Sequence, residues 1–326
     1  MKELNEEKNM TGNVKRIAFG PVPSRRLGQS IGINNIPQKM CTYSCIYCQL
    51  GRTYKMQIQR KKFYKPEEIL DSVKNKVIEA KKREEPIDYL TFVPDGEPTL
   101  DINLGDEIDL LRPLEINLAI ITNSSLIWNK DVRYDLSKAD WVCVKIDAIS
   151  QNIWQKINRP HSFLKLKKIL DGIIEFSHFF KGDLATETML IQNINDKDFE
   201  MEKIAYFISS LNIKKSYISI PIRPPAEKWV KSADEHSVTK AYQIFKEKNI
   251  DVEYLIGYEG NAFAYTGNVE EDLLSITSVH PMKEEALIEF LKKAGKDWSV
   301  IKKLLNDEKL KEVEYNNKKF YVRKFS

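Results

Sequence analysis

Residues 39–49 read Lys-Met-Cys-Thr-Tyr-Ser-Cys-Ile-Tyr-Cys-Gln, with three cysteines in the spacing Cys41-x3-Cys45-x2-Cys48. Three thiols within eight residues can hold a metal centre or form one crowded disulfide. The fourth cysteine of the chain, Cys143, lies in the apolar run of residues 141–144, where a thiol behaves as a small hydrophobic side chain. The loop therefore supplies three ligands and leaves one coordination position open.

The identity of the metal follows from what surrounds the three thiols. Structural zinc usually takes four ligands in Cys or His pairs, whereas the four histidines are scattered singly along the chain. Zinc completed by a distant histidine is one alternative, and a disulfide is another. Because the N-terminus does not resemble a signal peptide, we expect a reducing compartment, which disfavours the disulfide. An iron–sulfur cluster fits best, since thiolates hold such clusters and an unligated iron can be offered to a substrate.

Two motifs carry a resemblance to a known family. The cysteine loop, with the aromatic Tyr47 before its last cysteine, resembles the signature of the radical S-adenosylmethionine (SAM) superfamily. The segment Asp95-Gly96-Glu97-Pro98 follows the strand-like residues 89–93 and resembles the superfamily's Gly-Glu motif. The resemblance implies an enzyme with a [4Fe–4S] cluster and S-adenosyl-L-methionine as cofactors, built on a partial (βα)6 TIM-like barrel.

The composition agrees with a large soluble enzyme. The chain has 326 residues, of which 42% are hydrophobic and 30% charged, enough for one large domain and a small one. No apolar run approaches the roughly 18 residues of a membrane span, so we expect a cytoplasmic protein without membrane contact. The net charge of +4 equals the excess of 12 Lys/Arg over 8 Asp/Glu in residues 281–326.

The hydrophobic pattern predicts an α/β fold. Residues 1–13 are polar and aperiodic, and are expected to form a flexible tail before a barrel domain over residues 14–268. Short apolar runs predict strands, and residues 66–83 predict an amphipathic helix. Strands that alternate with helices imply a parallel sheet. The predicted strands are residues 30–34, 88–93, 117–122, 141–146, 184–191, 217–220 and 252–256.

Barrel geometry selects the candidate site, because the carboxyl ends of barrel strands meet at one mouth. Asn123 and Ser124 could equally serve a turn or a helix cap. Lys145 and Asp147 are stronger candidates, since charges inside a barrel strand require a function there. The expected mouth consists of residues 41–48, 95–98, 123–124, 145–147, 188–192 and 221–225.

The resemblance also implies roles for single residues. Cys41, Cys45 and Cys48 would ligate three irons, and the amino and carboxylate groups of SAM would chelate the fourth. The reduced cluster would then split SAM and release a 5′-deoxyadenosyl radical. No catalytic side chain is predicted. The predicted cofactor contacts are Tyr47 against the adenine, Gly96, Glu97 and Pro98 of the Gly-Glu motif, with Glu97 accepting from the methionyl amino group, Asn123 at the ribose and Lys145 at the methionyl carboxylate.

Residues 20–28, Gly-Pro-Val-Pro-Ser-Arg-Arg-Leu-Gly, narrow the resemblance to a group filed near the tRNA wyosine synthases. Arg25 and Arg26 could clamp a substrate carboxylate or phosphate, or bridge the open edge of the barrel. Wyosine synthases are expected to carry further cysteines for an auxiliary cluster, and this chain has only Cys143 to spare. We therefore predict a single-cluster enzyme of another specificity.

Residues 269–326 are expected to form a separate winged-helix-like domain, with helices over residues 269–279, 282–294 and 298–307 and a hairpin over 310–323. Its lysines could bind phosphates, or simply be solvated on a module that packs on the barrel. The cations considered are Lys302, Lys303, Lys318, Lys319, Arg323 and Lys324.

The leading hypothesis is an anaerobic radical SAM enzyme acting on a macromolecule, tRNA ahead of protein, with a reductant such as flavodoxin or ferredoxin. Alternatives are a non-enzymatic iron–sulfur sensor whose winged helix binds DNA, and a radical SAM enzyme acting on a small molecule. The sequence leaves the oligomeric state open.

Overall fold

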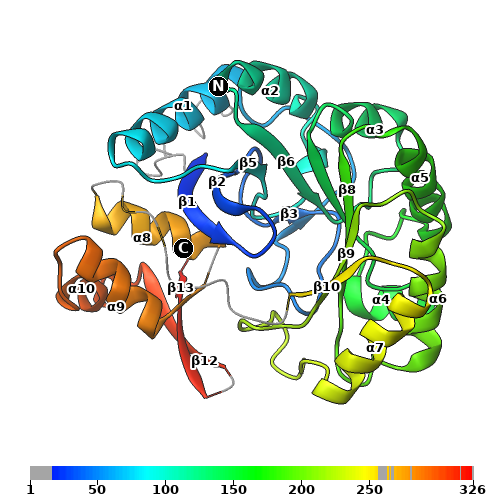
Figure 1. Ribbon diagram of the computed structural model, residues 1–326. Coiled ribbons are helices and arrows are strands. Elements are labelled where there is room, and N and C mark those ends of the chain that lie inside the picture. The colour runs from blue at the N-terminus through cyan, green and yellow to red at the C-terminus, as the bar shows by residue number, and fades with distance from the viewer. Residues whose placement is uncertain are drawn as a thin grey trace, which may run out of the picture.

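The computed structural model describes residues 17–255, 263, 265, 268–279, 281–315 and 317–324; the predicted tail over residues 1–13 lies outside them. Its main feature is one eight-stranded sheet that curls into a partial barrel (Figure 1). From the second strand onward, neighbours are parallel. The order is β1 (Ala18–Ser24), β2 (Gly28–Ile33), β5 (Tyr89–Phe92), β6 (Asn117–Thr122), β7 (Trp141–Lys145), β8 (Asp183–Met189), β9 (Lys215–Ser219) and β10 (Val252–Leu255).

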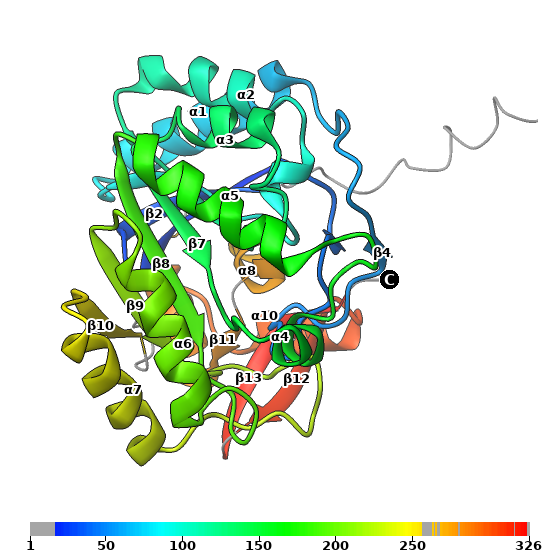
Figure 2. The same cartoon turned by 90° about the vertical axis from the view of Figure 1, so that its right-hand side faces the viewer.

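Helices form an arc around the outer side of the sheet (Figures 1 and 2). The first begins with Pro66, whose fixed backbone angle suits the first helical position, and its acidic first turn and basic last turn, Lys81 and Lys82, suit the two ends of the helix dipole. Its buried side chains confirm the predicted apolar stripe. The helices are α1 (Pro66–Lys82), α2 (Leu104–Leu111), α3 (Lys130–Leu136), α4 (Gln151–Asn158), α5 (Leu166–Phe179), α6 (Asp198–Ser209) and α7 (Glu235–Glu247), with the 3-10 turns η2 (Pro98–Leu100) and η3 (Arg112–Leu114).

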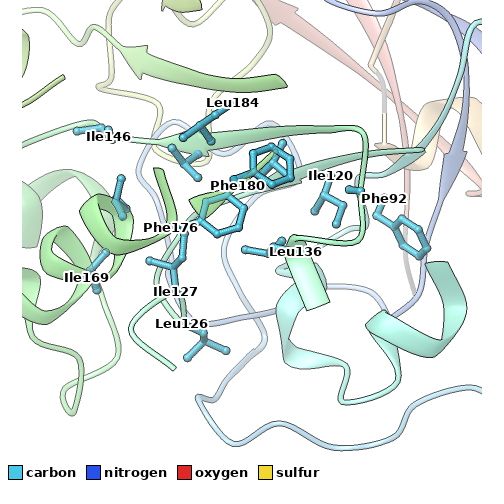
Figure 3. Close-up of a cluster of buried hydrophobic side chains, with 14 of the residues drawn as sticks. Phe92, Ile120, Leu126, Ile127, Leu136, Ile146, Ile169, Phe176, Phe180 and Leu184 are labelled. Carbon is cyan, nitrogen blue, oxygen red and sulfur yellow. The ribbon is translucent and has the colours of Figure 1, made fainter. Parts of the chain in front are cut away.

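The hydrophobic core lies between this arc and the sheet (Figure 3). Phe92 and Ile120 from the strands, with Leu136 and Phe176 from the helices, are fully buried there. Alternate residues of the same strands point to the inner side of the barrel, where Cys143 is also fully buried in a cluster with side chains such as Ala119 and Trp141. This packing holds the carboxyl ends of the strands in a fixed arrangement.

All seven predicted strands exist within a few residues of their predicted bounds, and Ile256 lies outside the described residues. The sequence failed to predict β1, which pairs antiparallel with β2. Pro21 and Pro23 argued against a strand there, because proline has no backbone N–H to donate to a neighbouring strand. Only one side of β1 is paired, so this edge strand tolerates both prolines.

A separate element carries the cysteines. After β2 the chain forms β3 (Met40–Cys41), which pairs in parallel with β4 (Lys55–Met56). The loop that carries the remaining cysteines lies between these two short strands.

The C-terminal residues form a compact unit beside β1 (Figure 1). The predicted helices and hairpin are confirmed, and a further short strand completes an antiparallel sheet in the order β11-β13-β12. Asn316, in the predicted hairpin turn, lies outside the described residues. The elements are α8 (Val269–Val279), β11 (Met282–Lys283), α9 (Glu284–Lys293), α10 (Ser299–Asn306), β12 (Leu310–Tyr315) and β13 (Lys318–Arg323).

This unit is joined to the barrel by its core. Phe19 and Val22 of β1 belong to the same hydrophobic cluster as Leu273 and Phe290. On the far side, the Tyr315 hydroxyl donates to the carbonyl of Pro221, which follows β9, at 3.0 Å. The unit therefore contacts the barrel both at its first strand, β1, and at the segment that follows β9. No helix in the described part of the chain is long and apolar enough to cross a membrane.

Candidate metal and cofactor site

The three cysteines lie on one loop and are half-buried free thiols. Side-chain amides from two barrel segments approach them: Asn123 Nδ2 lies 3.4 Å from Cys41 Sγ, and Asn158 Nδ2 lies 3.4 Å from Cys45 Sγ. Burial raises the pKa of Cys41 to about 12 and that of Cys45 well above its usual value. The charge of Cys48 also raises the pKa of Cys41, and the charges of Cys41 and Cys48 raise the pKa of Cys45, so the three groups share one small region.

The loop does not form a site for a single ion. Among the residues that the structure describes, no three His, Cys, Asp or Glu side chains are arranged to hold one metal ion. In an iron–sulfur cluster each thiolate takes a different iron, so the sulfurs need not converge on one point. Metal binding would also deprotonate the thiols, since the thiolate is the ligand.

The Gly-Glu motif clamps the start of the cysteine loop. Lys39 N donates to Asp95 O at 2.7 Å, and Glu97 N donates to Met40 O at 3.2 Å. A Cβ on Gly96 would lie 1.8 Å from the carbonyl oxygen of Met40. Close approach at Gly96 is therefore required, and the partner in the structure is the protein's own backbone.

The Glu97 carboxylate is directed into the protein. It is 1% exposed and accepts hydrogen bonds from Thr99 N (3.1 Å), Thr99 Oγ1 (2.6 Å), Thr122 Oγ1 (2.6 Å) and Asn123 N (2.8 Å). These contacts hold Asn123 at the end of β6, from where its amide reaches Cys41 and Thr42 Oγ1 (2.9 Å). Glu97 thus positions the site, and its predicted bond to a methionyl amino group stays a prediction.

Asp95 presents the opposite situation. Its carboxylate is 3% exposed, yet neither oxygen has a hydrogen-bond partner among the described residues. Burial, partly offset by the charge of Lys39, raises its pKa to about 8. A buried carboxylate without donors is costly unless a cation or donor reaches it. The charge of Asp95 also raises the pKa of Cys48, which places it near the cysteine loop.

Asp147 ties the loop to the barrel. It accepts hydrogen bonds from the Tyr47 hydroxyl, from Asn158 Nδ2 (2.8 Å) and from Met189 N (3.0 Å). Burial and the charge of Asp147 raise the pKa of Tyr47 well above its usual value. The Tyr47 ring lies under the Lys145 ammonium, 5.2 Å from its centroid.

A cavity of about 330 Å³ opens beside the loop. Its wall includes Tyr47, Cys48 and Lys145, together with residues of the β1–β2 hairpin and of the segment after β9. Asn123 instead lines a small cavity of about 20 Å³ behind the loop. Asp95, Gly96, Glu97 and Pro98 line neither of these two cavities.

A buried ion network forms one wall of the large cavity. Lys145 and Glu187 are register partners on β7 and β8, and their charged groups lie 2.9 Å apart. Glu187 also pairs with Arg26 and accepts from Ser219 Oγ at 2.9 Å. Burial by itself would raise the pKa of Glu187. The charges of Arg26 and Lys145 outweigh burial and hold this pKa well below its usual range. Arg25 donates to the carbonyl of Leu255 at the other edge of the sheet.

The structure therefore gathers most of the predicted residues around the loop, and adds several that sequence reasoning missed. Glu187 had a signal, because it is a charge within barrel strand β8, as Lys145 is in the preceding strand β7. Asn158 had none, since a single Asn is equally typical of a turn or a cap. Asp95 was expected at the mouth, but without a role of its own.

Comparisons with known proteins agree with this geometry. Residues 35–202, a little over half of the chain, match the Radical SAM superfamily model. The UPF0026 protein of Methanocaldococcus jannaschii is 50% identical over 310 residues, covering 94% of this chain and 96% of that protein. A UPF0026 protein of Helicobacter pylori is 33% identical over 222 residues, covering 67% of this chain and 70% of its own.

Among solved structures, TYW1 with a lysine-pyruvate adduct bound superposes with a TM-score of 0.54 at 17% identity, covering 68% of this chain and 75% of that one. At this identity the likeness shows the fold alone. The two sequence comparisons go further, and on their evidence the chain belongs to the radical SAM superfamily, among the UPF0026 proteins.

Proposed function

We propose that the protein is a radical SAM enzyme that uses a single [4Fe–4S] cluster to cleave SAM reductively and abstract hydrogen from a substrate. One observation carries the proposal: the three thiols of one loop stand at the carboxyl edge of a parallel sheet, and Cys48 forms part of the wall of a cavity large enough for a ligand. When bound, the cluster supplies the electron that divides SAM into methionine and a 5′-deoxyadenosyl radical.

The residues present fit these cofactors. Cys41, Cys45 and Cys48 would hold three irons, and the amides of Asn123 and Asn158 would donate to the ligating sulfurs. The ammonium group of SAM needs an acceptor, and within the described ranges no protein donor reaches the Asp95 carboxylate. We therefore propose that Asp95 takes the contact that the resemblance assigned to Glu97, and keep Glu97 and Gly96 as positioning residues. Since Asp95 lines neither cavity, the amino end of SAM would have to extend beyond the cavity wall to reach it.

The cavity wall would orient the rest of the cofactor. Tyr47 offers its ring to the cavity while its hydroxyl is held by Asp147, which suits a stacking role toward the adenine. Lys145 remains the proposed partner of the methionyl carboxylate, with Glu187 holding its ammonium beside the cavity. Apolar groups such as Met189 and Ile220 exclude water from the same space.

The proposal of a single cluster is supported by the position of Cys143. It is fully buried on the inner side of the barrel among apolar side chains, which are the surroundings of a core residue and not of a cluster ligand. An electron donor of the flavodoxin or ferredoxin type would reduce the cluster.

Anaerobic reconstitution tests the function. The wild-type protein should bind about four irons and, with dithionite, convert SAM to 5′-deoxyadenosine and methionine. Cys45→Ala should lose both properties, while Cys143→Ala, the matched control, should keep its iron. Zinc in place of iron, or unchanged iron in Cys45→Ala, would refute the cluster. A cluster that never cleaves SAM would favour the iron–sulfur sensor instead.

For the substrate we propose a macromolecule, tRNA ahead of protein. The C-terminal unit supports a winged-helix assignment by its element order and by its sheet order β11-β13-β12. Its charges do not favour a phosphate-binding surface. Lys303, Lys319 and Lys324 pair with Glu270, Glu312 and Glu308, while Arg323 donates to the carbonyl of Leu274. We therefore propose that this unit closes and braces the barrel, and that the nucleic acid binds elsewhere.

A further inference from the structure

The segment that follows the cysteine loop has an unusual charge. Residues 52–65 read Arg-Thr-Tyr-Lys-Met-Gln-Ile-Gln-Arg-Lys-Lys-Phe-Tyr-Lys, with six Lys/Arg and no Asp/Glu. This segment, called here the basic strap, runs from the end of the cysteine loop through β4 to the start of α1. Nothing in the proposed chemistry uses it.

Most of its charge is not neutralised. Arg60 pairs with Asp135, and Arg52 pairs with Glu227 while its side chain stays 70% exposed. The other four cations are exposed and make no ion pair with any residue in the described ranges. They are Lys55, Lys61, Lys62 and Lys65. The strap therefore differs from the C-terminal unit, in which acidic side chains are interspersed and pair with Lys303, Lys309, Lys319 and Lys324.

Aromatic rings are interleaved with these cations. Tyr54 is 72% exposed, and the Lys39 ammonium lies 4.5 Å from its ring centroid. The Lys61 ammonium lies 5.1 Å from the ring centroid of Phe63. A further ring, Phe163, is 76% exposed on the segment that bridges to the cysteine loop through Pro160 and Tyr43. Exposed rings among cations are typical of surfaces that bind single-stranded nucleic acid, where bases stack and phosphates meet lysine.

The strap is held in register with the candidate metal site. Met40 and Cys41 pair with Lys55 and Met56, and Gln57 N donates to Cys41 O at 3.1 Å. Farther along, Lys61 N donates to Leu100 O at 3.0 Å, just after the Gly-Glu motif. A ligand on the strap is therefore held at a defined distance from the cysteines and from the cavity beside Cys48.

We propose that the basic strap binds RNA, with its lysines on phosphates and Tyr54 against a base, and thereby presents one nucleotide of a single-stranded or loop region to the cavity. This inference rests on the proposed function for the choice of reaction, but the binding surface can be tested without it. An acidic protein would also be drawn to the lysines. It would gain little from the interleaved rings, and for that reason RNA is the occupant that the surface fits.

The test compares two variants with equal charge changes in the reconstituted full-length protein. Lys55→Gln/Lys61→Gln/Lys62→Gln removes three cations of the strap. Lys165→Gln/Lys168→Gln/Lys181→Gln removes three exposed cations that lie at α5 and just after it, outside the strap. Binding of mixed cellular tRNA is measured by fluorescence anisotropy over a series of salt concentrations. A third variant, Tyr54→Ala, leaves the charge unchanged.

Each phosphate contact on a single strand contributes about 0.7 to the slope of log affinity against log salt. The strap variant should therefore lower the slope by about 2 and weaken binding by about tenfold at low salt, while the α5 variant behaves like wild type. Tyr54→Ala should weaken binding without changing the slope. Equal affinity and slope in the strap variant and wild type would overturn the proposal. A Tyr54→Ala protein that binds RNA as wild type does, while poly-glutamate competes fully, would assign the surface to an acidic protein.

Iron content and SAM cleavage without RNA are measured on the same proteins. The strap variant should retain both, because its lysines lie outside the cofactor contacts. If the wild type fails to cleave SAM but binds tRNA through the strap, the proposed reaction fails and the binding surface stands. If it cleaves SAM but the strap variant binds tRNA normally, the reaction stands and the surface fails.

Discussion

Gly96 and the carbonyl of Met40 occupy adjoining space so tightly that a Cβ on Gly96 would lie 1.8 Å from the carbonyl oxygen. The Gly-Glu motif and the cysteine loop, more than forty residues apart in the sequence, are thus packed backbone to backbone. The clash cannot be relieved by rotating a side chain, because the obstructing atom belongs to the main chain. The geometry of the ligands therefore depends on a residue that ligates nothing.

Gly96→Ala is expected to displace the cysteine loop. We expect a loss of about 1–3 kcal/mol in the free energy of unfolding, as for an overpacked core position, and a lower iron content after reconstitution. Gly295→Ala is the control. A Cβ there meets nothing within 4 Å, so only the left-handed backbone costs stability, about 1–2 kcal/mol. Urea unfolding and iron analysis report both effects, and normal iron in Gly96→Ala would contradict the proposed role.

Asp95 and Glu97 should respond differently to neutral replacement. Asp95→Asn is expected to keep the cluster but weaken SAM binding by about 1.5–3 kcal/mol, the value of a charge-assisted hydrogen bond. Glu97→Gln places an amide donor among Thr99, Thr122 and Asn123, which all donate to the present carboxylate. It should therefore also lower the free energy of unfolding.

Electron paramagnetic resonance of the reduced cluster during a SAM titration separates the two cases, with urea unfolding alongside. An unaltered titration for Asp95→Asn, with weakened SAM binding for Glu97→Gln at full stability, would return the amino-group contact to Glu97.

Glu187 is expected to be essential for stability because it neutralises two buried cations. In Glu187→Gln, Arg26 and Lys145 lose their shared carboxylate, and we expect a cost of about 3–5 kcal/mol. Glu253→Gln is the matched control, since its pair with Lys215 is largely exposed and should contribute about 0–1 kcal/mol. Equal urea midpoints for the two variants would show that the network is not stabilising.

Glu107 makes the stability of the protein dependent on pH. It is fully buried next to Asn35, and burial together with the charge of Asp101 raises its pKa to about 9. Burial raises the pKa of Asp101 to about 6. Because the folded state holds these protons more tightly than the unfolded state, their contribution is complete at acid pH. It is lost progressively as the pH rises from the unfolded values near 4 towards 9.

Glu107→Gln removes one of these two titrating groups. The decrease in the free energy of unfolding from pH 5 to pH 8 should therefore be smaller in the variant than in the wild type, by on the order of 3 kcal/mol. Below pH 5 the variant and the wild type should be similar. Urea unfolding of the iron-free protein at both pH values measures the difference. A parallel pH dependence in the two proteins would show that Glu107 is ionised in the folded state.

Local patterns in the sequence were enough to predict the alternation of strands and helices, since apolar periodicity reflects which face of each element is buried. The bounds of β6 and of the hairpin strands β12 and β13 agree with their predicted ranges. The prediction failed for β1, where Pro21 and Pro23 argue against a strand and only the position at the sheet edge permits one.

The candidate site divides in the same way. The spacing of Cys41, Cys45 and Cys48 is a local property, so the sequence alone identified the loop, and the Gly-Glu motif was recognised likewise. The partners of these residues were decided by the tertiary structure. Lys145 meets Glu187 because β7 and β8 are neighbours in register, and Glu97 is surrounded by donors because β6 ends beside η2. Such contacts depend on strand order and packing, which a local stretch of sequence does not specify. For that reason only the folded chain showed that, among the described residues, Asp95 lacks a donor while Glu97 has four.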